Sequence, residues 1–155
     1  MTKRIIKLVL LIICMVIIFM FSSDTGEVST KKSDGVIVRI SEFFVGHHLS
    51  DAERQEKIDK YVFIIRKSAH YGIYFILGFL IMSNLIEFDK LDKTVILYYA
   101  IVFSFLYACS DEVHQLFVPG RSGKALDVLL DTFGSSCGIG FYLLWDKIVR
   151  RGKYE

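Results

Sequence analysis

The chain has 155 residues, of which 53% are hydrophobic and 23% are charged, and its formal net charge is +2. A composition this apolar excludes an intrinsically disordered chain, and the near-neutral charge does not indicate a nucleic-acid partner. The apolar residues are gathered into long runs, and no CxxC spacing suggests a disulfide or zinc framework. We expect a single membrane domain over residues 1–155.

The first apolar run, Leu8–Phe21, follows Lys3, Arg4 and Lys7. A basic segment before an apolar run is also typical of a secretory signal peptide. Here, however, no small-residue cleavage site follows, and the run is longer than the usual apolar core of a signal peptide. We interpret residues 5–22 as an uncleaved first membrane helix.

Three further apolar runs predict membrane spans at about residues 68–86, 94–111 and 127–145. Each run lies near the lower limit of roughly 17–25 residues that a helix needs to cross the hydrocarbon core. Backbone polar groups in lipid must be satisfied within the segment, so these spans are expected to be helical.

Four spans place both termini on the same side of the membrane. Basic residues favour the cytoplasmic side, and they are more densely spaced in the two tails and in the loop between the second and third spans. That side would hold Lys3, Arg4, Lys7, Lys90, Lys93, Lys147, Arg150, Arg151 and Lys153. We therefore predict a multi-pass protein of the cell membrane with cytoplasmic termini.

The segment between the first two spans would form an outer-face region of short amphipathic helices. Ser50 and Glu53 fit the capping-box pattern that begins a helix, and apolar residues then recur at helical spacing into the second span. Further upstream, apolar side chains at Val36, Ile40 and Phe43 share one helical face, although Val36–Val38 also fits a short strand. The predicted fold is therefore all-α, with four transmembrane helices.

Two short segments predict breaks in this helical pattern. Gly46–His48 would separate the amphipathic pieces. Val118–Arg121 predicts a turn, because Pro119 sets one φ angle and Gly120 supplies the permissive position after it.

Polar clusters end the first span, begin the second, end the third and lead into the fourth, so the predicted topology places them all at one membrane face. Their residues are Ser22, Ser23, Arg66, Lys67, His70, Asp111, Glu112, His114, Gln115, Arg121, Lys124, Asp127 and Asp131. A charged side chain at the bilayer centre costs roughly 2.5–3.5 kcal/mol on insertion scales, so charge this close to lipid indicates a functional site.

The fourth span carries a stripe of acids and glycines. Asp127 and Asp131 are four residues apart, and Gly134 and Gly138 continue the same helical face. Small residues let a neighbouring helix approach closely. Two like charges at this spacing repel, so the acids should have basic partners, or one of them should be protonated. The available partners are Arg66, Lys67, Arg121 and Lys124.

Several interpretations of the polar face stay open. It could be a structural network of ion pairs between short helices, or it could bind an anionic headgroup through Arg66, Lys67 and Arg121, because arginine matches phosphate geometry. The full set of candidate ligand-binding residues is Arg66, Lys67, His70, Asp111, Glu112, Gln115, Arg121, Asp127 and Asp131.

Catalysis would use His70 or His114 as the acid or base, oriented by Asp111 or Glu112. A metal site is the weakest interpretation, because the segment DEVHQ is not HExxH, and we predict neither a metal nor another cofactor. A small proton-coupled transporter would use Asp131 as the carrier. The one-sided cluster argues against it, because transporters usually bind their substrates near the midplane.

Several motifs occur together between about Phe21 and Gly138. They are Ser22-Ser23 with Gly26, Arg66–His70, Ser110–Gln115, Phe117–Arg121, Asp127, Asp131, Gly134 and Gly138. This set resembles the VanZ-like family of membrane proteins, although Asp24 stands where the family often has glutamine.

The family is named after a member linked to low-level resistance to teicoplanin, a glycopeptide that acts on cell-wall precursors outside the membrane. Together with the polar face, the resemblance implies a site for an anionic lipid or a lipid-linked cell-envelope ligand. An enzyme acting on a lipid-linked cell-wall substrate is the alternative.

Overall fold

The computed structural model describes residues 2–87 and 91–151. Two basic residues that the topology argument counts, Lys90 and Lys153, lie outside the described residues. The helices are α1 (Thr2–Ser23), α2 (Gly26–Val45), α3 (Asp51–Leu85), α4 (Lys93–Gln115) and α5 (Ala125–Arg151). The predicted all-α fold is confirmed. The alternative of a short strand at Val36–Val38 is wrong, because these residues lie within α2.

Four helices, α1, α3, α4 and α5, are long and apolar enough to cross a membrane. The 35 residues of α3 give a length of about 52 Å at 1.5 Å per residue, well above the roughly 30 Å of a hydrocarbon core. The charged first half of α3 therefore extends beyond the core. Together the four helices make the chain a multi-pass membrane protein.

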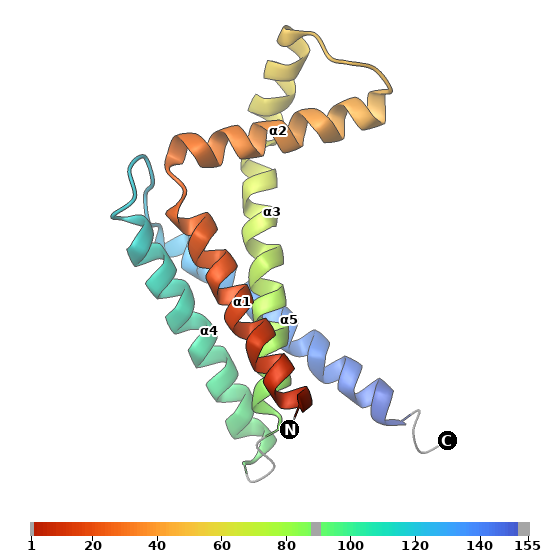
Figure 1. The fold of residues 1–155 in the computed structure, drawn as a ribbon, viewed down its shortest axis with the longest axis vertical. Helices are drawn as coiled ribbons and strands as arrows, with labels where there is room; N and C mark the ends of the chain where they lie inside the picture. Colours follow the sequence, from red (N-terminus) through yellow and green to blue (C-terminus); the bar gives the residue numbers. More distant parts are fainter. Residues whose placement is uncertain (1, 88–90, 152–155) are drawn as a thin grey trace.

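The spanning helices form a bundle, and α2 lies across one end of it (Figure 1). We call this end the α2 end. The last turn of α1, the α4–α5 connection and the start of α5 lie there, whereas α1 begins and α3 ends at the opposite end. The predicted short amphipathic pieces are in fact one 20-residue helix, α2, followed by the protruding first half of α3.

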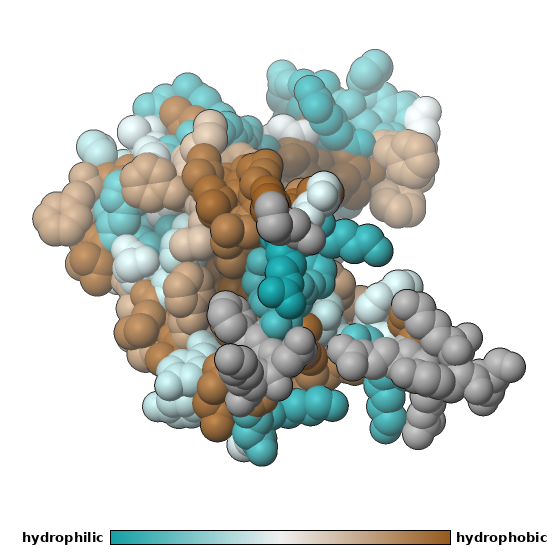
Figure 2. All heavy atoms as spheres, turned by 60° about the horizontal axis from the view of Figure 1, so that its bottom comes forward, coloured by the Kyte–Doolittle hydropathy of each residue, from teal (hydrophilic) through white to brown (hydrophobic). Residues whose placement is uncertain are grey.

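Apolar side chains cover much of the outside of the bundle. Figure 2, in which the opposite end comes forward, shows brown apolar patches on the surface beside teal hydrophilic residues. The exposed apolar side chains of α1 include Ile5, Leu8, Ile12, Val16 and Phe19. An apolar surface of this extent is typical of contact with lipid.

The closest helix contact joins α3 and α5. A Cβ added to Gly78 would lie 2.0 Å from the Ser135 carbonyl oxygen, and one added to Gly138 would lie 1.9 Å from the Phe75 carbonyl oxygen. The Ser135 hydroxyl also donates to the Tyr74 carbonyl at 3.0 Å. The prediction that glycines on the fourth span allow close approach is therefore confirmed.

The corner between α2 and α3 follows the sequence signals. Gly46 ends α2 with a φ of 80°, a left-handed conformation that glycine adopts without steric cost. The Ser50 hydroxyl accepts from the Glu53 amide, and the Glu53 carboxylate accepts from the Ser50 amide, which completes the predicted capping box.

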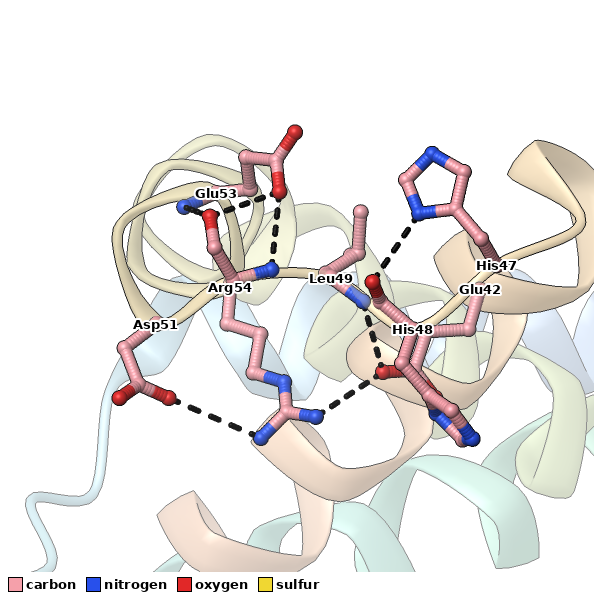
Figure 3. A network of polar contacts seen from close by, with 8 residues as sticks. Glu42, His47, His48, Leu49, Asp51, Glu53 and Arg54 are labelled. Atoms are coloured by element: carbon pink, nitrogen blue, oxygen red, sulfur yellow. Dashed lines mark hydrogen bonds and ion pairs between the residues drawn. The ribbon is translucent and has the colours of Figure 1, made fainter.

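A carboxylate stabilises this corner further (Figure 3). Glu42 of α2 accepts hydrogen bonds at 3.1 Å from the Leu49 amide and from the Arg54 guanidinium of α3. The Leu49 amide, followed by contacts with His48 and Arg54, lowers the pKa of Glu42 below its ordinary value. The orientation of α2 across the bundle thus depends in part on one ionised side chain.

Candidate functional site

The Val118–Arg121 turn packs against the junction of α1 and α2. The Arg121 amide donates to the Val118 carbonyl at 3.1 Å, and Gly120 has a φ of 73°, so the predicted turn is confirmed. The Gly26 amide donates to the Pro119 carbonyl at 3.0 Å, and a Cβ on Gly26 would lie 2.1 Å from the Gly120 carbonyl oxygen. The two segments can approach this closely only because residue 26 has no side chain.

Arg121 joins this turn to the end of α1. Its Nε donates to the Asp24 carbonyl at 3.0 Å and its Nη2 to the Phe21 carbonyl at 2.8 Å. A cation at a helix C-terminus satisfies the last carbonyls and interacts favourably with the helix dipole. Burial lowers the pKa of the Arg121 guanidinium, which stays charged at physiological pH. Arg121 therefore has a structural role in the α1–α2 connection.

A cavity of about 310 Å³ opens at the α2 end, between α1, α2, α3, α4 and the turn. Its size is at the lower end of the range for small-molecule sites, roughly 300–1,000 Å³. The apolar lining residues are Ile18, Phe21, Val36, Ile65, Ala69 and Ile73. The polar lining residues are Ser22, Asp24, Ser29, Lys32, Ser33, Arg66, His70, Tyr74, Asp111 and Arg121.

The three cations of the cavity differ in their partners. Lys32 forms an ion pair with Asp24 at 2.6 Å, and Arg121 donates to backbone carbonyls. Arg66 is half-buried and forms neither a hydrogen bond nor an ion pair within residues 2–87 and 91–151. Ser22 adds a buried hydroxyl without a hydrogen-bond partner there. The cavity therefore offers donors that the described protein does not use.

Basic residues of α3 meet the acids of α5. Lys67 forms an ion pair with Asp127, and His70 Nδ1 lies 3.5 Å from Asp131 Oδ2. The expectation of a basic partner is thus confirmed for Asp127. Asp131 faces a histidine instead of one of the four expected cations, because the close α3–α5 contact brings these two positions together.

Three carboxylates at the α2 end are buried: Asp111 is 5% exposed, Glu112 4% and Asp131 0%. Gln115 Nε2 donates to Asp111 Oδ2 at 3.3 Å, and the Lys124 amide donates to Glu112 Oε2 at 2.8 Å. Glu112 Oε1 and both oxygens of Asp131 have no hydrogen-bond partner in the described part of the chain. Buried polar atoms in proteins are normally paired, so this group is incompletely satisfied.

His114 does not join these residues. Its Nε2 lies 3.1 Å from the Ser23 hydroxyl, and its ring stacks on Phe19 with centroids 4.6 Å apart. His114 therefore faces α1, whereas Asp111 and Gln115 of the same helix are buried. Of the two candidate acid–base residues, only His70 lines the cavity.

The predicted ligand-binding residues fall into three groups. Arg66, His70, Asp111 and Arg121 line the cavity. The residues Glu112, Gln115 and Asp131 are buried but do not line it, and Lys67 and Asp127 form their own ion pair.

Tyr74 and the polar residues of α2 also belong to the site, although they were not among the predicted site residues. Tyr74 is completely buried, and its hydroxyl has no hydrogen-bond partner among the described residues. It lies four residues after His70, so helical spacing from that histidine could have found it. Ser29, Lys32 and Ser33 line the cavity from α2, and their i, i+3 and i+4 spacing was the available signal.

The chain matches the VanZ/LLP1 family over residues 7–146, a range that includes the cavity and the buried acids. No curated protein and no solved structure matches the chain. The resemblance read from the short motifs is confirmed, and the chain belongs to the VanZ/LLP1 family.

Proposed function

We propose that the cavity at the α2 end binds the anionic headgroup of a membrane lipid or of a lipid-linked cell-envelope molecule. Arg66 carries this proposal, because it lines the cavity and its guanidinium has no partner in the described part of the chain. A phosphate or carboxylate group would supply acceptors that match the planar fork of arginine.

The rest of the lining supports an amphipathic ligand. Arg121 uses two of its five N–H groups on carbonyls, which leaves the others for a ligand. The buried Ser22 hydroxyl adds a further polar group. Apolar side chains such as Ile18 and Val36 form the neighbouring wall, where the lipid portion would pack.

The predicted topology places this site on the outer face of the membrane, where cell-envelope precursors are exposed. We propose that binding there lowers susceptibility to glycopeptides such as teicoplanin. The family resemblance supports this link, and Arg66→Ala should abolish the resistance in cells while the protein remains in the membrane.

The direct test measures lipid binding to purified full-length protein in nanodiscs that contain phosphatidylglycerol or only phosphatidylcholine. Arg66→Ala should weaken phosphatidylglycerol binding about tenfold or more, because a charge-assisted hydrogen bond contributes about 1.5–3 kcal/mol. The control is Arg39→Ala, which removes an exposed arginine of α2 that does not line the cavity. Equal binding by the Arg66→Ala protein and wild type would refute the proposal. Disappearance of the variant from the membrane would favour a structural ion-pair network.

One observation favours an enzyme acting on a lipid-linked substrate as a second candidate. His70 lines the cavity and lies 3.5 Å from Asp131, as a general base with an orienting carboxylate would. In that case His70→Gln should bind a labelled envelope lipid but not convert it. His114→Gln should behave as wild type, because His114 faces α1.

A further inference from the structure

Three metal-ligating side chains meet beside the cavity from three different helices. They are His70 of α3, Glu112 of α4 and Asp131 of α5, and one donor atom from each lies within 4.8 Å of the other two. We propose that these three side chains bind a divalent transition-metal cation such as Zn²⁺.

The charge of the surroundings supports a cation. Asp111, Glu112 and Asp131 are all at most 5% exposed, and among the described residues no lysine or arginine forms an ion pair with any of them. Lys67 of α3 is paired with Asp127 instead. Buried carboxylates are usually paired with a cation or coordinated to a metal. A divalent cation would compensate two of these three carboxylates.

The unpartnered atoms supply an observation independent of charge. Both oxygens of Asp131 and Oε1 of Glu112 are buried and have no hydrogen-bond partner among the residues that the structure describes. The second oxygen of Glu112 accepts from the Lys124 amide at 2.8 Å, which orients the carboxylate as outer-shell contacts do at metal sites.

The donor types favour zinc over magnesium or calcium, and the spacing is compatible with zinc. Ligand atoms at 2.0–2.1 Å from a tetrahedral zinc ion are about 3.3 Å apart. His70 Nδ1 and Asp131 Oδ2 are 3.5 Å apart, and the Glu112 donor lies within 4.8 Å of the other two. An imidazole among the ligands suits zinc and similar metals, whereas magnesium and calcium prefer oxygen alone. Three protein ligands would leave a fourth position next to the cavity that His70 lines.

Under this proposal His70 is a metal ligand, in place of the acid–base role in the second candidate function. The headgroup site and the metal site are tested separately, because zinc binding is measured without anionic lipid.

The experiment uses full-length protein in detergent micelles, stripped with a chelator and titrated with Zn²⁺ against a chromophoric competitor. Wild type should bind one equivalent. His70→Gln, Glu112→Gln and Asp131→Asn should each weaken binding by at least tenfold, since even the loss of an outer-shell partner costs about 10–100-fold. The matched controls are His114→Gln and the double variant His47→Gln/His48→Gln, which remove histidines outside the site and should bind zinc as wild type does.

A second measurement does not depend on whether the site variants fold, because it uses wild type and the double variant of the two exposed histidines. Wild type loaded with Co²⁺ should show the intense visible absorption of a tetrahedral site, and the exposed-histidine double variant should show it too. An octahedral spectrum, zinc binding that survives Asp131→Asn, or binding that disappears with His47 and His48 would overturn the proposal. Wild type that binds no zinc and shows protonated carboxyl bands in the infrared would also overturn it, because protons would then neutralise the acids.

Discussion

Carboxylates at the two ends of the helix bundle differ in how many basic partners they have. At the opposite end, one carboxylate, Glu87, has two basic partners: Arg4 at 2.6 Å and Lys7. Hydrogen bonding to Lys7, and secondarily to Arg4, lowers the pKa of Glu87. At the α2 end the balance is reversed, because three carboxylates are buried and His70 pairs with only one of them, Asp131.

The charged side chains at one end hold a helix end in place, whereas those at the other end are available to bind a ligand. The network around Glu87 is complete without any further molecule. At the α2 end, Arg66 has no partner and the buried Asp131 oxygens have no hydrogen-bond partner among the described residues. A bound anion would pair with Arg66, and a bound cation would pair with the Asp131 oxygens.

The largest effect should come from separating α3 and α5. Gly78→Val places a Cβ 2.0 Å from the Ser135 carbonyl oxygen, and because that atom is backbone, the helices must move apart. We expect a loss of about 3 kcal/mol or more in the free energy of unfolding, and with it the contact between His70 and Asp131. Size-exclusion profiles and thermal unfolding in detergent measure this.

Gly140→Val is the matched control, since a Cβ there meets nothing within 4 Å. If both variants are equally stable, the close α3–α5 contact does not position the site.

The next effect contrasts the two arginines of the cavity. Arg121→Ala should lower the free energy of unfolding by about 1.5–3 kcal/mol, because it removes charged hydrogen bonds to two carbonyls at the end of α1. Arg66→Ala should change it by less than about 0.5 kcal/mol, because Arg66 has no protein partner among the described residues. Detergent-driven unfolding of both variants checks this. Equal destabilisation would mean that Arg66 is also structural.

A smaller effect compares one ion pair at each end. Lys67→Ala leaves Asp127 without another basic partner among the described residues, whereas Lys7→Ala leaves Glu87 with Arg4. Both pairs are partly exposed, so we expect a cost of about 1 kcal/mol for Lys67→Ala and roughly half of that for Lys7→Ala. Double-mutant cycles with Asp127→Ala and Glu87→Ala measure the two coupling energies. A larger coupling for Lys7 would reverse the proposed contrast.

The smallest effect concerns pH at the corner that orients α2. The folded protein holds the pKa of Glu42 below its ordinary value. Ionised Glu42 therefore stabilises the fold above the pKa that this carboxyl has in the unfolded chain, and this stabilisation is lost as pH falls through its pKa in the folded protein. Hydrogen exchange at the Leu49 amide, which donates to Glu42, should therefore lose protection in acid. Glu42→Gln should remove this pH dependence, and Glu27→Gln, an exposed acid of α2, should retain it. Unchanged protection of Leu49 in acid would contradict the prediction.

Local features of the fold could be predicted from the sequence. The four spans, the capping box at Ser50, the helix end at Gly46 and the turn at Val118–Arg121 all appear in the structure. Each depends on residues that are close in the chain, through apolar run length, side-chain capping or the φ preference of glycine and proline. The length of α2 was missed, because polar residues occupy its first turns and hide the helical pattern.

Alternating spans bring their connecting ends together, so the gathering of polar residues at one end of the bundle also follows from the sequence. Which of these residues meet depends on the tertiary structure. His114 and Glu112 lie on the same helix, but His114 faces α1. Glu112 instead converges with His70 and Asp131, which come from two other helices. The reason is physical: convergence depends on the rotation of each helix about its axis and on the close α3–α5 crossing, and neither quantity is encoded in the spacing along a single segment.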